Sequence, residues 1–555
     1  MLKKNSTPEF VAAVKAVEDR ADECYRPLRL LRAPQNQALW ALLSGTVGQV
    51  EDQIGRWGTE SPHFQAALLN LSRIGPVVMR WIAKHGKPES RLVKTYRWTD
   101  ALKGDVKEAI ETGLHYSTFL GCFPMWYRDR LSAEFLSDSA VRFTVPGGSR
   151  ERQVSAYHKG FRPKQGHFRG ITGKRVEQSS SVKRLFGAVL QNARSTGLHK
   201  FRYNDSPELV AALMPEYENR VNTILRRADS IDLGGYTMQE FKLFYIALLI
   251  TCAIHEHLCY LWGQSAHLFP HSSSVMVNRR ASWVGSLATI AGLSRPHCEK
   301  MLDDLTLCLD KGADLHIQPF VPLDRDATTL ALAANFPLNS RWDENILRIC
   351  SYSRPEIYSV ASSEKETEMR SALIAGNRMY RIEGPAKLPA PLPDIDFIVE
   401  DPHSSTVVIA ELKWIRKPLK PLERIDRDAE VLHGIDQLAA IRQYLSEHAK
   451  HLMDQRKLTR PLSDYEHVQY LLIARDHWVW VDPRHEVAIV DFDPFRRLLS
   501  ESTDLWSAVT ELLQYDWLPV EGRDFRVQFD RATANGAAIE SEVFYANEGR
   551  AANRS

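Results

Sequence analysis

Apolar residues recur at every third or fourth position along most of the chain before residue 315, which is the period of a helix packed on one side. Three such runs lie near the N-terminus, and each follows Ser, Thr or Pro, the usual helix-start residues: 7–25, 34–57 and 61–86. Three more follow later: 206–231, 236–263 and 294–312. We expect a helical N-terminal domain over residues 1–140 and a helical middle domain over 206–315.

The pattern changes after residue 315. Short extended pieces bounded by prolines fill a connecting region, 316–361, and a helix is expected to begin near Ser362 or Ser363. Strand-like and helix-like runs then alternate over 362–530, which is typical of an α/β unit. The expected fold class is a multidomain chain, mainly α-helical in its N-terminal and middle regions, followed by an α/β domain with a mixed central sheet. Residues 531–555 are rich in Ala, Asn, Gly and Glu and are expected to form a flexible tail.

Composition places the chain among soluble proteins. Of its 555 residues, 44% are hydrophobic and 25% are charged, and seven scattered cysteines without a CxxC pair indicate reduced thiols. The N-terminal residues mix acids and bases without the apolar core of a secretory signal. The most apolar run, Phe244 to Ile254, is too short for a membrane span and predicts a buried helix. We expect a cytoplasmic protein with no membrane partner.

The net charge of +2 conceals a basic segment at 141–205, with fourteen Lys or Arg against two Glu between Val141 and Tyr203. Its glycines and scarce aliphatic residues predict a mobile segment. Cations bind phosphates and interspersed aromatics stack on bases, so nucleic acid is the expected ligand. The candidate contacts are Arg162, Lys164, Arg169, Lys174 and Arg175. The alternative is a solvated linker whose charges only keep it soluble.

Two predicted strands carry acids in an unusual arrangement. In the first, Asp394 and Asp396 share one face while the alternate residues are apolar. In the second, Val407 to Trp414, charge appears only at Glu411 and Lys413, after four consecutive apolar residues. Such charges lie at the rim of a buried sheet, where they need partners. A divalent cation, Mg²⁺ or Mn²⁺, would meet that need, since carboxylate oxygens are its preferred ligands. The alternative is a purely structural ion pair.

The strand pair PDIDFIV and VVIAELKW resembles the core of the PD-(D/E)XK, or restriction-endonuclease-like, nucleases. The resemblance covers the C-terminal third of the chain, with the domain at 362–530. It implies that Asp396 and Glu411 hold the metal, that the Leu412 carbonyl adds a ligand, and that Lys413 orients or deprotonates the attacking water. Asp394 directly follows Pro393 and shares a face with Asp396, so it is a further candidate ligand. The spacing of fourteen residues before Glu411 favours Asp396.

The same resemblance implies accessory residues. A Gln in the helix after the Glu-x-Lys triplet contacts the site in this family, and Gln437 matches that placement, although an amide at the core edge fits equally well. An acid from the first helix is also expected, without a choice among Glu364, Glu366 and Glu368. Arg416, Lys417 and Lys420 follow the second strand and are candidate contacts to the phosphate backbone.

The function expected from the resemblance is a divalent-metal-dependent nuclease that hydrolyses phosphodiester bonds of DNA, with endonuclease and exonuclease cleavage both left open. Its biological setting would be bacterial restriction or antiviral (antiphage) defence. The helical domains would recruit substrate, a protein partner or a second copy of the chain. The alternative function is a catalytically inactive module that binds nucleic acid or a partner on a nuclease fold.

Overall fold

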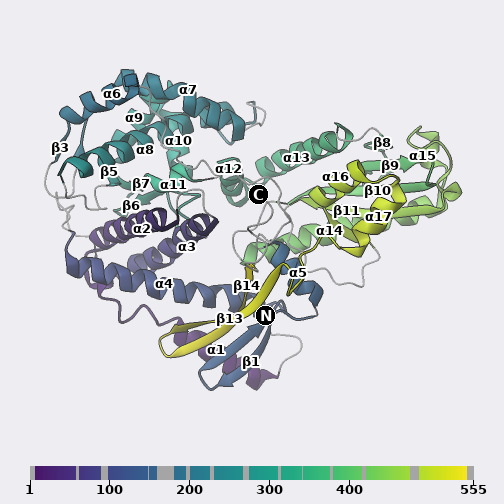
Figure 1. The fold of residues 1–555 in the computed structure, drawn as a ribbon, viewed down its shortest axis with the longest axis horizontal. Helices are drawn as coiled ribbons and strands as arrows, with labels where there is room; N and C mark the ends of the chain where they lie inside the picture. The colour runs from purple at the N-terminus through teal and green to yellow at the C-terminus, as the bar shows by residue number, and fades with distance from the viewer. Residues whose placement is uncertain are drawn as a thin grey trace. The chain divides into compact units, whose positions relative to one another are not determined.

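The computed structural model describes residues 7–57, 62–88, 98–147, 149–158, 180–195, 201–204, 206–224, 230–266, 274–309, 314–340, 342–375, 379–415, 421–475 and 487–546. By their contacts the residues form two compact units, each built from separate stretches of chain (Figure 1). Unit 1 is Met1–Glu18, Phe119–Gly166 and Ser359–Ser555, and unit 2 is Asp19–Thr118 and His167–Tyr358. In coarse terms the expected fold class is confirmed, because the chain is multidomain and rich in helix, with a mixed sheet in its C-terminal part.

Unit 2 is mainly helical. Its helices are η1 Arg29–Arg32, α2 Gln35–Trp57, α3 Pro62–His85, most of α4 Asp100–Tyr127, α6 Ser180–Gln191, α7 Pro207–Ile224, α8 Met238–Ala266, α9 Arg280–Ala291, α10 Arg295–Asp304, α11 Asn335–Leu338 and α12 Trp342–Ser353. Its strands are β3 Arg194–Ser195, β4 Phe201–Arg202, β5 Val275–Arg279, β6 Phe320–Pro322 and β7 Thr329–Ala333. The last three form a sheet in the order β5-β7-β6.

Unit 2 contains most of both regions that were expected to form separate N-terminal and middle domains, so this expectation is corrected. The Leu315 N–H donates to the Ser72 carbonyl at 3.1 Å, and the Arg80 guanidinium donates to the Leu309 carbonyl at 2.7 Å. The physical reason is the sheet β5-β7-β6: every residue of its central strand β7 is buried, so other segments must pack against both faces of that strand. The segment 316–361 supplies β6 and β7, so it belongs to the core of this unit and does not merely connect two domains.

The expected buried helix at Phe244 to Ile254 is confirmed as the centre of α8. Within the described residues α8 is the one helix long and apolar enough to cross a membrane, over Met238–Trp262. In the most apolar 18-residue stretch of this helix 72% of the residues are buried inside the protein, as expected for a helix in a protein core.

The expectation of a flexible tail is wrong as far as residue 546. Strands β1 Ser132–Ser137, β2 Ala140–Thr144, β13 Phe525–Ala534 and β14 Ala537–Ala546 form a second sheet in unit 1, in the order β1-β2-β14-β13. Helix α5 Ser149–His158 packs on it through Ala156, which contacts Phe525 and Phe544. Helix α1 Pro8–Ala21 begins in the same unit. The composition of residues 531–555 was a poor guide because the β13–β14 hairpin needs few apolar residues when other segments cover only one of its faces.

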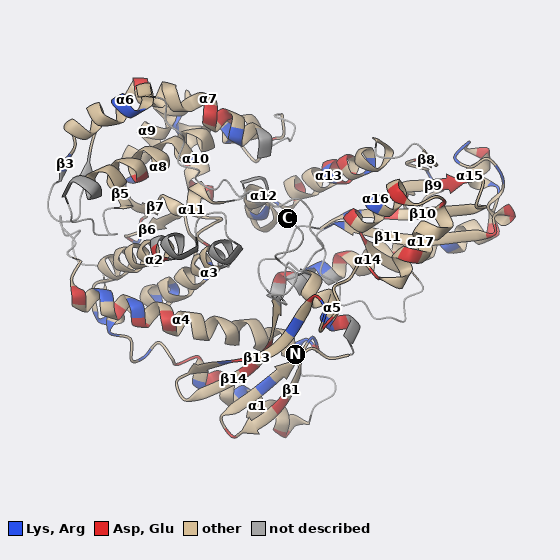
Figure 2. Ribbon diagram, in the orientation of Figure 1, with Lys and Arg blue, Asp and Glu red and all other residues tan. Residues whose placement is uncertain are grey.

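The expectation of a mobile basic segment is also corrected at both of its ends. Residues 149–158 and 180–191 form α5 and α6, and α6 buries Val182, Phe186 and Val189 at helical spacing. Residues 159–179, which carry Arg162, Lys164, Arg169, Lys174 and Arg175, lie outside the described residues. Elsewhere, for example in the first half of α4, basic and acidic residues are mixed (Figure 2).

The α/β part of unit 1 is a five-stranded mixed sheet in the order β12-β11-β10-β9-β8. The strands are β8 Arg381–Glu383, β9 Phe397–Asp401, β10 Thr406–Trp414, β11 His467–Arg475 and β12 Ala488–Asp491. The helices are α13 Pro355–Ala375, α14 Pro421–Glu447, α15 His451–Asp454, η3 Leu462–Asp464, α16 Phe492–Glu501 and α17 Leu505–Gln514. Strand β10 pairs antiparallel with β9 and parallel with β11. Helix α13 starts earlier than expected, at Pro355, because Pro is favoured in a first helical turn.

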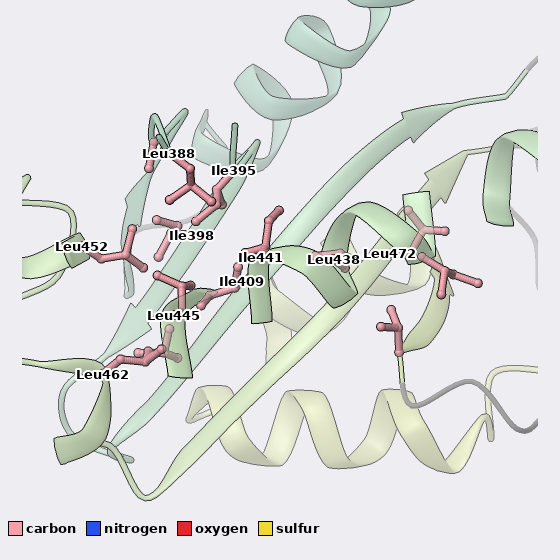
Figure 3. Close-up of a cluster of buried hydrophobic side chains, with 14 of the residues drawn as sticks. Leu388, Ile395, Ile398, Ile409, Leu438, Ile441, Leu445, Leu452, Leu462 and Leu472 are labelled. Carbon is pink, nitrogen blue, oxygen red and sulfur yellow. The ribbon is translucent and has the colours of Figure 1, made fainter. Parts of the chain in front are cut away.

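One face of this sheet is sealed by α14. Helix residues Leu438, Ile441 and Leu445 lie against sheet residues that include Ile398 and Ile409 (Figure 3). Because side chains alternate along a strand, Glu411 and Lys413 lie on the same face as Ile409. Helices α16 and α17 contact β10, β11 and β12 as well. The sheet therefore holds the charged end of β10 beside an apolar core.

Candidate functional site

The site begins where β10 runs beyond its neighbour. The ladder between β9 and β10 ends at the pair Phe397 and Ala410, while β10 continues to Trp414. On its other edge β10 stays paired with β11 to its end. One edge of β10 from Glu411 onward therefore has backbone groups that β9 does not satisfy, and a buried strand must find them other partners.

Two carboxylates take over these N–H groups. The Leu412 N–H donates to Oδ2 of Asp396 at 3.0 Å, and the Trp414 N–H donates to Oε1 of Glu366 at 3.2 Å. In a strand the N–H and C=O of one residue point to the same edge, so the Leu412 carbonyl also faces this side. The backbone thus anchors one oxygen of each of two acids, from the start of β9 and from α13.

Glu411 is the third acid. Its side chain is 4% exposed, Oε1 accepts a hydrogen bond from Nζ of Lys413 at 2.7 Å, and Oε2 is buried without a hydrogen-bond donor among the described residues. Burial and the nearby charge of Asp396 raise the pKa of Glu411 to about 8, against the lowering effect of Lys413. Glu411 therefore keeps its proton well above the pH at which an ordinary glutamic acid loses it.

Lys413 remains a cation in this setting. Burial alone would lower its pKa, but the charge of Glu411 and its hydrogen bond, with the other two carboxylates, raise the pKa above its usual value. Its stem lies beside Gly434 of α14, where a Cβ atom would come within 3.3 Å of Lys413 Cε. The lysine therefore suits orientation of a water molecule or an anion better than removal of a proton.

Helix α13 presents two charged residues to the site, four positions apart on one face. Burial raises the pKa of Glu366, as does Asp396, while the Trp414 N–H, Lys413 and Arg370 lower it. Arg370 lies 3.5 Å from Oδ1 of Asp396. The sequence did not decide which acid of the first helix joins the site, and among the described contacts it is Glu366, through the Trp414 N–H. Sequence reasoning missed Arg370, which the spacing of four residues from Glu366 could have suggested.

The structure separates the two predicted aspartates. Asp394 is exposed, and its Oδ1 accepts a hydrogen bond from the Leu388 N–H at 3.4 Å. Ile395, between the two aspartates, is already bonded to Ala386, so the chain directs Asp394 toward the preceding loop. Among the described contacts none joins Asp394 to Glu411 or Asp396, so the structure brings Asp396, and not Asp394, to the other acids.

The remaining predicted residues are placed less directly. Gln437 lies on α14, half-buried, with Oε1 buried and without a hydrogen-bond donor in the described part of the chain. Of the other acids on α13, Glu368 pairs with Lys365 within the helix. Arg416, Lys417 and Lys420 lie outside the described residues.

The donor set fits a hard divalent cation. Among described residues no three Asp, Glu, His or Cys side chains are gathered closely enough to chelate an ion as they stand. However, Asp396 and Glu411 are near enough to share a hydrogen bond when Glu411 is protonated, which raises the pKa of Glu411, and Glu411 Oε2 accepts no hydrogen bond from an N–H or O–H donor of the described residues. Carboxylate and carbonyl oxygens are what Mg²⁺ and Mn²⁺ prefer. Comparison of the chain with protein-family models, with curated proteins and with solved structures finds no match.

Proposed function

We propose that the chain is a divalent-metal-dependent nuclease that cleaves DNA at the end of β10. The observation that carries the proposal is the cluster of Glu366, Asp396 and Glu411 beside Lys413, where β10 outruns β9. Three acids around a buried strand end repel one another unless cations offset them. A site that concentrates negative charge in this way and still keeps a lysine suits the binding of a metal ion and a phosphate together.

Each residue has a distinct task in this proposal. Asp396, Glu411 and the carbonyl of Leu412 would hold the Mg²⁺ or Mn²⁺ ion, with Glu366 close by. The ion would polarise the phosphoryl group, lower the pKa of a bound water and stabilise the leaving oxygen. Lys413, protonated because its pKa is raised, would turn from Glu411 to orient the attacking water or a phosphate oxygen. Gln437 would line the same side of the site from α14.

Three broader features belong to the proposal. The domain would be restriction-endonuclease-like, in keeping with three strands in antiparallel succession, β8, β9 and β10, followed by α14 and the parallel strand β11. The protein would act in the cytoplasm, since none of the seven cysteines, all of them among the described residues, forms a disulfide. Restriction or antiphage defence is the proposed setting, with the helical unit recruiting DNA or a partner.

Cleavage assays on linear, circular and single-stranded DNA, with and without Mg²⁺ or Mn²⁺, test the proposal. We expect metal-dependent cleavage by the wild type and a loss of about 100-fold or more in Glu411→Ala and Lys413→Ala. The matched pair is Asp396→Asn, expected to be inactive, and Asp394→Asn, expected to cleave normally. Undiminished cleavage in both Glu411→Ala and Lys413→Ala would refute the assignment. DNA binding without cleavage by the wild type would favour an inactive binding module.

A further inference from the structure

Arg370 is a charged residue at the site that the proposed reaction does not yet use. It lies one helical turn after Glu366 on α13, and its side chain is 18% exposed. Met369 and Leu373 of the same helix are buried, so the helix is held in place by its apolar side. The Arg370 side chain is therefore carried to the site by a packed helix and is partly exposed.

Within the described part of the chain, the contacts of Arg370 leave most of its donors unused. Its distance of 3.5 Å to Asp396 is an ion pair longer than a charge-assisted hydrogen bond, which is about 2.7–2.9 Å. Its Nε is buried and has no hydrogen-bond partner among the described residues. Lys413, in contrast, is engaged with Glu411 at 2.7 Å. Of these two cations at the site, Arg370 has the donors to spare.

The charges at the site favour a further anion once a metal ion is bound. Glu366, Asp396 and Glu411 carry up to three negative charges, and Lys413 and Arg370 carry two positive ones. A divalent cation would reverse the sign of this balance and compete with Arg370 for Asp396. A guanidinium with free N–H groups is the side chain best suited to grip phosphate oxygens in pairs.

We propose that Arg370 binds a phosphate of the DNA strand at this site, releasing Asp396 as it does so. The inference rests on the proposed function, because it assumes that DNA enters at the same carboxylates. Arg370 is then a substrate-contacting residue supplied by α13, and it places a phosphate beside Lys413. Helix α13 thereby contributes an acidic residue, Glu366, near the metal and a cationic residue, Arg370, that contacts the DNA strand.

The test is DNA binding by the full chain with Ca²⁺ in place of Mg²⁺, measured by fluorescence anisotropy of a labelled duplex over a range of salt concentrations. We expect Arg370→Gln to bind roughly ten- to hundredfold more weakly. Its plot of log affinity against log salt should lose about one unit of slope, the signature of one lost phosphate contact. Arg370→Lys should keep the slope and lose affinity only a few-fold, since it keeps the charge but not the paired donors.

Lys365→Gln is the matched control, because it removes a cation of the same helix that pairs with Glu368. It should bind as the wild type does. An Arg370→Gln variant that folds and binds with unchanged affinity and slope overturns the inference. Should that variant misfold, an Arg370→Lys variant with a reduced slope overturns it instead. If Arg370→Gln loses DNA binding while the wild type never cleaves DNA, the phosphate contact is supported and the proposed nuclease activity is refuted.

Discussion

A carboxyl group that water cannot reach holds its proton more tightly, and the buried Glu411 has its pKa raised from 4.5 to about 8. Between these values the folded chain keeps this proton and the unfolded chain does not. Folding stability contributed by the protonated acid is therefore lost as the pH rises from about 5 to above 8. The residue that would bind metal is thus a source of instability when metal is absent.

Replacing Glu411 by Gln should remove this pH dependence. Denaturant unfolding in EDTA at pH 5 and at pH 8.5 should show a smaller loss of stability for Glu411→Gln than for the wild type. The difference should be on the order of a few kcal/mol, since one pKa unit corresponds to about 1.4 kcal/mol. Asp394→Asn, which changes an exposed acid nearby, should follow the wild type. Identical pH dependence in wild type and Glu411→Gln would contradict the account of Glu411.

At the scale of elements, the site depends on how closely α14 approaches the end of β10. A Cβ atom at Gly434 would lie 2.8 Å from Leu472 Cδ1 and 3.3 Å from Lys413 Cε. Both contacts are tight, and Leu472 is fully buried in β11, so its side chain has little room to withdraw. The absence of a side chain at Gly434 lets the helix cover the sheet without displacing the lysine.

Gly434→Ala should therefore destabilise the chain by roughly 1–3 kcal/mol, as overpacking usually does, and reduce cleavage by shifting Lys413. Gly187→Ala on α6 is the control, because a Cβ atom there meets nothing within 4 Å. That variant should be slightly more stable than the wild type, since Ala favours helix over Gly. Thermal unfolding of the two variants decides the matter. Equal stability of both would show that α14 can move away without cost.

The elements also show what the sequence could and could not predict. Strand β10 was predictable because four apolar residues precede Glu411, and α14 because its apolar residues recur at helical spacing. The choice of Glu366 over its neighbours was not predictable, since it depends on the N–H of Trp414, which lies beyond the end of β9 and donates to Glu366. Which N–H groups a strand leaves free is decided by its partner's length, and no local pattern records that length.

At the scale of the whole molecule, both units join segments that are distant in sequence. Strand β14 lies between β2 and β13, so residues near the C-terminus complete a sheet begun by residues 132–144. Arg142 pairs with Glu540 at 2.7 Å, and Arg152 pairs with Glu542 at 2.7 Å. Contacts across several hundred residues leave no local signal, which is why composition alone suggested a loose tail.

A chain that ends at Gly536 should therefore lose the sheet β1-β2-β14-β13, because it lacks a strand with neighbours on both sides. Glu542 is 2% exposed at its side chain and also accepts the Val145 N–H, so its removal takes these partners away from Arg152 and from the Val145 N–H. Hydrogen–deuterium exchange should accelerate at β2 and β13 and stay slow at α8, which belongs to the other unit. A chain that ends at Ala546 retains every one of these pairs and should exchange as the full chain does. Isolated two-stranded hairpins are only marginally stable. If β2 stays protected after truncation at Gly536, the β1–β2 hairpin is stable without β14 and the prediction is contradicted.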